Sequence, residues 1–193
     1  MLGGTFDPPH LGHLIVAAEA RAQLGLDRVV LVPAGQPPHK PSGPTFSAEL
    51  RLRLLAAAVE AEPGLAVSRI EIDRPGPSFT ADTLEAIAAA EPGARLWFIL
   101  GADQLVMLGT WRDPERILAA ARLAIAPRAG VGAVEAEALA ATIAPDGVDW
   151  LASPLIGISS SMVRERLTAG RPIRWLVPPA VEEVLRGEGL LAS

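Results

Sequence analysis

The chain has 193 residues, half of them hydrophobic, which suits one globular domain with a substantial core and leaves little room for a second. Its 17 basic and 22 acidic residues give a formal net charge of -5 without a basic cluster, so the composition argues against a nucleic-acid-binding surface. The absence of cysteine excludes disulfides and thiolate chemistry, and charged residues interrupt every apolar stretch before it could span a bilayer. We therefore expect a cytoplasmic protein with no nucleic-acid or membrane partner.

Apolar patterns predict that strands and helices alternate along the chain. The β-branched run R-V-V-L-V-P at 28–33 is typical of a strand that is buried on both faces of a parallel sheet. Alternation of this kind predicts an α/β fold with a doubly wound parallel sheet and a small C-terminal helical part, in which ligand binds at the carboxyl ends of the strands. We expect a single domain over 1–193, with the helical part at about 159–193. Further strands are predicted over 66–73, 95–100, 123–126 and 148–151, and helices over 11–24, 47–62, 80–90, 134–143, 159–170 and 178–186, with helical segments between 102 and 121.

The first strand of such a sheet should precede the helix at 11–24, but only Met1 and Leu2 are available before the first glycine. Either the chain starts late, or the first strand is shortened at the centre of the sheet. A shortened central strand would weaken the fold.

The segment M-L-G-G-T-F-D-P-P-H-L-G-H at 1–13 runs directly into the first predicted helix. Its glycines and prolines predict a tight loop that delivers these residues to the helix N-terminus, where free N–H groups and the partial positive charge favour an anion. His10 and His13 are three residues apart, so both rings would lie on one side of the helix start and donate to the same ligand. The segment therefore suits a polyphosphate. Two alternatives stay open: a stiff turn with surface histidines, and a metal pair, which is disfavoured because His39 is the only further imidazole and there is no cysteine.

Two later segments follow predicted strands, where functional loops are expected. The proline-rich stretch at 33–44 carries His39 and Lys40 as its only basic side chains. Asp103 follows the strand at 95–100 and could reach ribose hydroxyls or a metal-bound phosphate. Each also has a purely structural interpretation, the stretch as a rigid surface linker and Asp103 as a helix cap.

The segment I-S-S-S-M-V-R at 158–164 puts three hydroxyl groups at the head of a predicted helix. Amides and hydroxyls of the helix start, with the guanidinium of Arg164 one turn in, could form a second polyphosphate cradle. The alternative is an ordinary cap, with Arg164 paired to Glu165 or Glu183 on a solvated face.

Two further stretches contain candidate ligand contacts. The stretch P-S-F-T-A-D-T-L at 77–84 is typical of a loop followed by a helix, which Ser78 or Thr80 could cap. A lone tryptophan is more often part of a core, but Trp111 stands in the polar stretch T-W-R-D-P, which makes a ligand contact more plausible than usual.

Taken together, these motifs resemble those of the nucleotidylyltransferase superfamily. G-G-T-F-D-P-P-H-L-G-H is similar to the signature that holds the triphosphate of a nucleotide, and its long form looks most like that of the bacterial nicotinate-nucleotide adenylyltransferase family. I-S-S-S-M-V-R resembles the family's I-S-S/A-T-x-I-R motif, with Ser161 where threonine is common. The resemblance covers nearly the whole chain and implies a Rossmann-like nucleotidylyltransferase fold. It also implies that the adenylyl group of ATP, with Mg²⁺, is transferred to nicotinate mononucleotide, giving nicotinate adenine dinucleotide and pyrophosphate in NAD biosynthesis.

The resemblance carries over to individual positions of this chain. His10, His13 and Arg164 are the positions expected to act in catalysis, and Trp111 is expected to stack on the pyridine ring. The implied ATP-binding positions are Gly3, Gly4, Thr5, Phe6, His10, Gly12, His13, Gly101, Asp103, Ile158, Ser159, Ser160 and Arg164. The implied mononucleotide-binding positions are His39, Lys40, Phe79, Thr80, Trp111 and Arg112.

The chain has neither a Walker G-x-x-x-x-G-K-[ST] motif nor a dinucleotide-binding G-x-G-x-x-G motif, and no obvious covalent nucleophile with a paired base. These features fit direct transfer, in which a phosphate oxygen of the mononucleotide attacks the α-phosphorus of ATP in line. Nicotinamide mononucleotide, phosphopantetheine or FMN as the acceptor, and a non-catalytic nucleotide-binding sensor domain, are the alternatives. The sequence is also compatible with a homo-oligomer.

Overall fold

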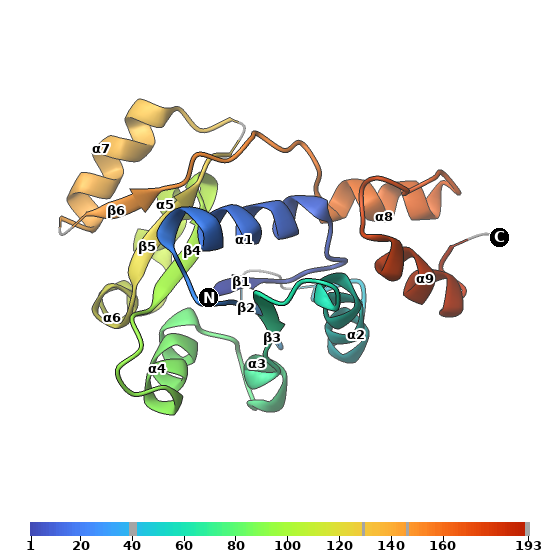
Figure 1. The fold of residues 1–193 in the computed structure, drawn as a ribbon, viewed down its shortest axis with the longest axis horizontal. Helices are drawn as coiled ribbons and strands as arrows, with labels where there is room; N and C mark the ends of the chain where they lie inside the picture. The colour runs from blue at the N-terminus through green and yellow to red at the C-terminus, as the bar shows by residue number, and fades with distance from the viewer. Residues whose placement is uncertain (39–41, 129, 146, 192–193) are drawn as a thin grey trace.

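The computed structural model describes residues 1–38, 42–128, 130–145 and 147–191. Within these residues, six parallel strands form one sheet in the order β3-β2-β1-β4-β5-β6 (Figure 1). The predicted α/β fold with a doubly wound parallel sheet is therefore confirmed. The strands are β1 (Leu2–Gly4), β2 (Val29–Pro33), β3 (Leu65–Val67), β4 (Trp97–Gly101), β5 (Arg122–Ala126) and β6 (Val148–Trp150).

Helices connect the strands and complete the C-terminal part. Figure 1 shows α1 running across one side of the strands, with α8 and α9 beyond its N-terminal end as the predicted C-terminal helical part. In the portion of the chain that the structure describes, no helix is long and apolar enough to cross a membrane. The helices are α1 (Leu11–Leu24), α2 (Ala48–Val59), α3 (Ile70–Asp73), α4 (Thr80–Ala90), α5 (Ala102–Met107), the 3-10 helix η1 (Leu108–Thr110), α6 (Pro114–Ala120), α7 (Ala133–Ile143), α8 (Ser160–Thr168) and α9 (Pro179–Gly187).

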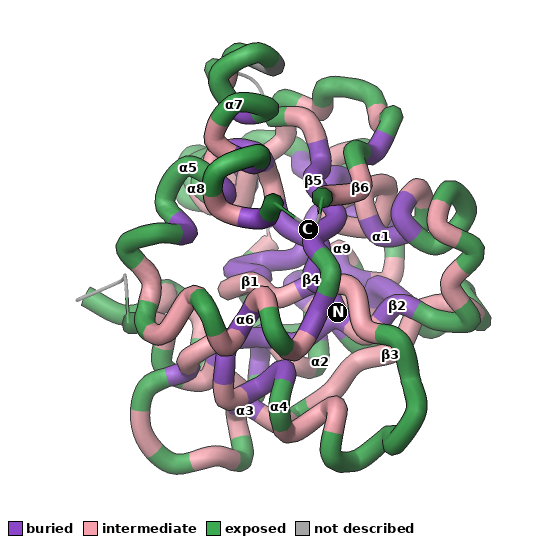
Figure 2. The backbone as a smooth tube through the Cα atoms, turned by 90° about the vertical axis from the view of Figure 1, so that its left-hand side faces the viewer, coloured by how far each residue is buried: buried purple, intermediate pink, exposed green. Residues whose placement is uncertain are grey.

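Both faces of the sheet are buried, because successive side chains along a strand point to opposite faces. In β4, Ile99 packs into the hydrophobic cluster formed with α1, α2, α8 and α9, whereas Phe98 and Leu100 pack into the cluster formed with α4, α5, α6 and α7. Figure 2 shows the result as buried strands at the centre, surrounded by more exposed helices and loops. The continuous apolar runs of the sequence reflect this burial on both sides.

The shortest of the central strands is β1, which lies between β2 and β4. Gly3 and Gly4, which the glycine pattern assigns to a loop, instead belong to this strand and pair with Val32 and Pro33 of β2. The main-chain carbonyl of Met1 accepts a hydrogen bond from the amide of Ile99, so β1 is anchored on its other side as well. The loop prediction is wrong for the two glycines because partners on both sides outweigh the low strand preference of glycine.

The predicted strand over 66–73 is correct only at its start. β3 ends at Val67, and Ile70–Asp73 forms the short helix α3, in which the carbonyl of Arg69 accepts from the amides of Ile72 and Asp73. Four residues are too few for their apolar alternation to separate a strand from a helical turn. The backbone of α3 also lies against the loop that follows β2, which a continued edge strand would not do.

The strand order places the binding crevice. From β1 the sheet grows through β2 to β3, whereas from β4 it grows in the opposite direction through β5 to β6. The chain connections therefore diverge between β1 and β4, and ligands of such sheets bind at the carboxyl ends of the strands at this point.

Candidate active site

A cavity of about 570 Å³ opens at the carboxyl ends of β1 and β4. It joins residues from both ends of the chain, since Ser160 lies in its wall together with the first strand and loop. Of the predicted site residues, the wall contains Gly3, Gly4, Thr5, Phe6, His10, Gly12, His13, Thr80, Gly101, Asp103, Trp111 and Ser160.

The two histidines form a stacked pair at the start of α1. Their ring centroids are 3.7 Å apart, and the ring of Phe6 meets that of His13 edge-on at 4.8 Å. The amide of His10 donates to Nδ1 of His13 at 3.1 Å, so a neutral His13 must carry its proton on Nε2. Nδ1 of His10 is buried and has no hydrogen-bond partner among the described residues. The pair thus presents imidazole groups that a ligand in the cavity can satisfy.

Both histidines are neutral near pH 7. Burial lowers the pKa of His10 from its usual 6.5 to about 4, and the positive charge of Arg128 acts in the same direction. Burial, His10 and Arg128 together hold the pKa of His13 well below 6.5. A neutral imidazole carries one N–H, so each histidine can donate one hydrogen bond to a ligand without being charged.

This depressed pKa makes stability depend on pH. Between about pH 6.5 and about pH 4, the unfolded chain binds a proton at His10 that the folded chain does not, so the free energy of unfolding falls as the pH decreases through this window. We expect His10 to account for roughly 2–3 kcal/mol of that fall. Urea unfolding of the wild type and of His10→Gln, each at about pH 7 and about pH 4.5, measures it as the difference between the two proteins. Equal losses in both proteins would show that His10 keeps its ordinary pKa in the folded state.

Side chains of the site lie close to two glycines, one in α1 and one at the end of β4. A Cβ atom at Gly12 would lie 3.0 Å from the imidazole of His10, which covers this position. At Gly101, a Cβ atom would collide with the carboxylate of Asp103. The helix α5 has Gly101 as its N-cap and no side-chain cap, so the interpretation of Asp103 as a cap is wrong. Asp103 lines the cavity.

The loop between β1 and α1 is held by two buried charged residues that the sequence reading missed. The carboxylate of Asp7 accepts from the amides of Thr45 and Phe46, both at 2.9 Å. Arg51, which is 1% exposed, donates to three carbonyls, those of Thr5 at 2.8 Å, Phe46 at 3.2 Å and Gly35 at 3.4 Å. The sequence does contain a signal for the burial of Arg51. This residue stands three residues before Leu54 and four before Leu55, which places it on the apolar face of α2.

The serine motif at the start of α8 approaches the same loop. Ser160 donates from its hydroxyl to the carbonyl of Pro8 at 2.8 Å, and Ser159 caps the helix by accepting from the amide of Met162. Ile158 packs against the core and does not line the cavity. This motif therefore contributes Ser160 to the cavity and uses Ser159 as a cap.

Arg164 lies beside the loop, outside the cavity wall. Its guanidinium donates to the carbonyl of Asp7 at 2.6 Å and to the hydroxyl of Ser161 at 3.1 Å, and it borders a shallow depression next to Thr45. Its partner is thus Asp7 in place of the glutamates considered from the sequence. Its assignment to the triphosphate stays a prediction.

The other predicted group lies around the start of α4 and the stretch after η1. Trp111 lines the cavity and packs against Phe98 at a centroid distance of 6.0 Å. Phe79 and Arg112 are outside the cavity wall, where the guanidinium of Arg112 lies 4.4 Å from the centre of the Phe79 ring. His39 and Lys40 lie outside the described residues.

Ser78 and Thr80 do not cap α4 through their side chains, contrary to that interpretation of the sequence. The helix begins after Phe79, and the hydroxyl of Ser78 instead accepts from the amides of Gly35 and Gln36. These two hydrogen bonds connect the loop that follows β2 to the residues just before α4.

Arg128 is a basic residue of the cavity wall that the sequence reading also missed. Its Nε lies 3.9 Å from an oxygen of Asp103, and its charge reaches both histidines. Its position, just after β5, repeats the pattern that indicated Asp103 after β4. A cation at this place would favour an anionic ligand in the cavity.

Comparison with known proteins agrees with this architecture. Residues 1–166 match the cytidylyltransferase-like family. The chain belongs to this family. Among curated relatives, a protein from Thermomicrobium roseum is 42% identical over 98% of this chain and 89% of its own length, and one from Thermus thermophilus is 43% identical over 98% and 97%. Both carry the name probable nicotinate-nucleotide adenylyltransferase, which confirms the resemblance seen in the motifs.

Solved structures of this kind share the fold. The nicotinic acid mononucleotide adenylyltransferase of Plasmodium falciparum in complex with NaAD superimposes with a TM-score of 0.77, covering 98% of this chain and 94% of that chain at 18% identity. The same enzyme in complex with APC gives a TM-score of 0.75, with the same coverage, at 17% identity. At such identity the likeness concerns the arrangement of the helices and strands.

Proposed function

We propose that this cytidylyltransferase-like protein transfers the adenylyl group of ATP to nicotinate mononucleotide, forming nicotinate adenine dinucleotide and pyrophosphate in NAD biosynthesis. One observation carries the proposal: a single cavity at the point where the strand order diverges holds the neutral pair His10 and His13 together with Thr80 and Trp111. Relatives named for this activity, at 42% and 43% identity over nearly the whole chain, support it.

The chemistry needs alignment more than proton transfer. A phosphate oxygen of the mononucleotide attacks the α-phosphorus of ATP, the bond to the bridging oxygen breaks, and pyrophosphate leaves. A phosphate dianion is already a nucleophile, so the protein contributes by aligning the reactants and stabilising the charge that moves to the leaving group. His10 and His13 line the cavity as donors for the triphosphate, and Ser160 lies beside them with its hydroxyl proton donated to the carbonyl of Pro8. Arg164 joins them if its guanidinium exchanges the Asp7 carbonyl for phosphate oxygens.

Magnesium fits this site as part of the nucleotide substrate. The described residues contain no cluster of three or more metal-ligating side chains, whereas the triphosphate itself supplies oxygen ligands of the kind that Mg²⁺ prefers. Bound to ATP, the ion would neutralise charge on the phosphates. Asp103 is the carboxylate after β4 that could contact it from the cavity wall.

Pyrophosphate release tests the proposed reaction directly. The purified protein is incubated with ATP, Mg²⁺ and, in parallel, nicotinate mononucleotide, nicotinamide mononucleotide, phosphopantetheine or FMN. We expect turnover to be greatest with nicotinate mononucleotide. Preference for another acceptor would keep the triphosphate site and overturn the assigned acceptor, and ATP binding without release in any arm would favour a nucleotide sensor.

Replacing Trp111 should raise the KM for the mononucleotide more than the KM for ATP. Trp111→Ala removes an aromatic face from the cavity wall, so we expect the KM for nicotinate mononucleotide to rise roughly 10-fold and the KM for ATP to change less than about 2-fold. Trp175→Ala is the matched control, since Trp175 is 76% exposed in the C-terminal part. Steady-state kinetics with each substrate varied in turn measures the two KM values. An equal rise in both KM values would assign Trp111 to core packing.

A further inference from the structure

Glu71 is a buried carboxyl group that the proposed reaction does not use. The residue is 7% exposed, comes from the short helix α3, and lies in the wall of the same cavity as Thr80. Buried carboxyl groups persist in proteins when donors surround them, so its partners indicate what it holds in place.

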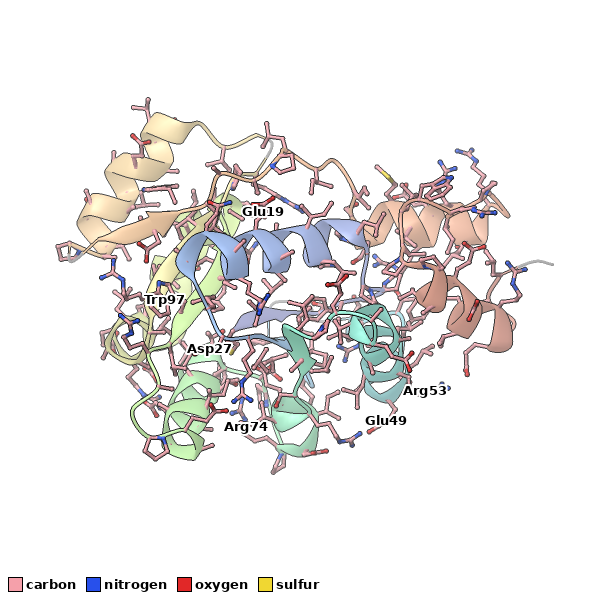
Figure 3. The ribbon with its side chains drawn as sticks, in the orientation of Figure 1. Glu19, Asp27, Glu49, Arg53, Arg74 and Trp97 are labelled. Carbon is pink, nitrogen blue, oxygen red and sulfur yellow. The ribbon has the colours of Figure 1, made fainter. Side chains whose placement is uncertain are left out.

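On one side, Glu71 is connected to the start of α4. The hydroxyl of Thr83 donates to the carboxylate at 2.7 Å and accepts in turn from Arg74 at 2.9 Å. Arg74 also donates to the carbonyl of Phe79, the residue before Thr80. Figure 3 shows Arg74 between α3 and α4, where it closes this chain of hydrogen bonds.

On the other side, the same helix contacts the loop that follows β2. The main-chain carbonyl of Glu71 lies so close to Gly35 that a Cβ atom there would collide with it. The hydroxyl of Ser78 accepts from the amides of Gly35 and Gln36, at 2.9 Å and 3.2 Å, which leaves its own proton free for an acceptor. Burial raises the pKa of Glu71, while hydrogen bonding by Thr83 and Ser78 and the charge of Arg74 act in the opposite direction.

We propose that Glu71 is a positioning residue. It fixes the position of the loop at 35–38 relative to the start of α4, and these two segments form walls of the mononucleotide end of the cavity. This inference rests on the proposed function, because the reaction assigns the mononucleotide to that end. A carboxylate suits the task since both its oxygens accept hydrogen bonds. A glutamine has one acceptor oxygen and turns a donor toward the hydroxyl on the other side.

The kinetic test compares Glu71→Gln with Asp73→Asn, which removes an exposed carboxylate from the same short helix. We expect Glu71→Gln to raise the KM for nicotinate mononucleotide about 10-fold, with the KM for ATP and kcat each changed less than about 2-fold, and Asp73→Asn to behave as the wild type. Thr83→Val keeps the shape and removes the hydroxyl, so it should show the same split. The double variant Glu71→Gln/Thr83→Val should be no worse than Glu71→Gln alone, because both changes break one chain of hydrogen bonds.

Amide hydrogen exchange tests the same inference without turnover. In Glu71→Gln, the amides of Gly35 and Gln36 should exchange about 10-fold faster than in the wild type, while amides of α9 keep their rates. Wild-type protein that releases no pyrophosphate from ATP with nicotinate mononucleotide as the acceptor would contradict the proposed function, and the exchange rates would still decide the connection through Glu71. Unchanged exchange at Gly35 and Gln36, or an equal rise in both KM values, would overturn the inference. If Glu71→Gln fails to fold, Thr83→Val takes its place in both measurements.

Discussion

Replacing His13 by alanine should lower kcat by roughly 10²–10³. Its Nδ1 accepts from the amide of His10, so the donor that remains for the triphosphate is Nε2–H, which alanine lacks. Because burial and the neighbouring charges keep the pKa of His13 well below 6.5, this donor persists across neutral pH. The loss should therefore be similar at about pH 6 and about pH 8.

The control for His13→Ala is a change on the same helix that leaves the cavity intact. Glu19, labelled in Figure 3, accepts from the side chain of Gln23 and does not line the cavity, so Glu19→Ala should keep wild-type kcat. Thermal unfolding of both variants establishes that each is folded at the assay temperature. Wild-type turnover by folded His13→Ala would remove His13 from the mechanism.

Replacing Arg51 by methionine should lower the free energy of unfolding by about 3 kcal/mol. The guanidinium is buried and donates to the carbonyls of Thr5, Gly35 and Phe46. Methionine fills part of the space but leaves these carbonyls without their donor, and it removes one of the positive charges near the buried carboxylate of Asp7, which keeps Arg164 at 3.5 Å. A loss of this size is a large fraction of the stability of a domain.

Arg53 supplies the matched control for this prediction. It belongs to the same helix, as Figure 3 shows, but its side chain is 56% exposed and pairs with Glu188 at 2.9 Å. Arg53→Met should therefore change the free energy of unfolding by less than about 0.5 kcal/mol. Urea unfolding followed by circular dichroism measures both variants. Comparable losses for the two arginines would mean that the hydrogen bonds of Arg51 add little to stability.

Several features of the fold and site could be predicted because they are local in the sequence. The β-branched run that became β2 and the helical spacing that became α1 depend on neighbours within one element. The placement of His10 and His13 at a helix start followed from their spacing and from the glycines and prolines before them. Where a pattern was short, as over the residues that became α3, local spacing could not separate a helical turn from a strand.

The residues that were missed act through partners far away in the sequence. Arg51 contacts Thr5, 46 residues before it, and Asp7 contacts Thr45 across 38 residues. The surroundings of Glu71 come from the loop after β2 and from α4, which meet only when the sheet has formed. A charged side chain in such a place looks like an ordinary surface residue in the sequence, because burial is not a local property.

By itself, the sequence determined most of the order of helices and strands, the α/β class and the place of His10 and His13 at a helix start, since periodicity, glycine, proline and histidine spacing act over a few residues. Tertiary structure alone decided that β1 lies between β2 and β4, that Arg128 faces the histidines, and that Arg164 is bonded to Asp7. The physical reason is that sheet pairing and burial bring distant segments together, and the strength of a charge or a hydrogen bond is set by what surrounds it there.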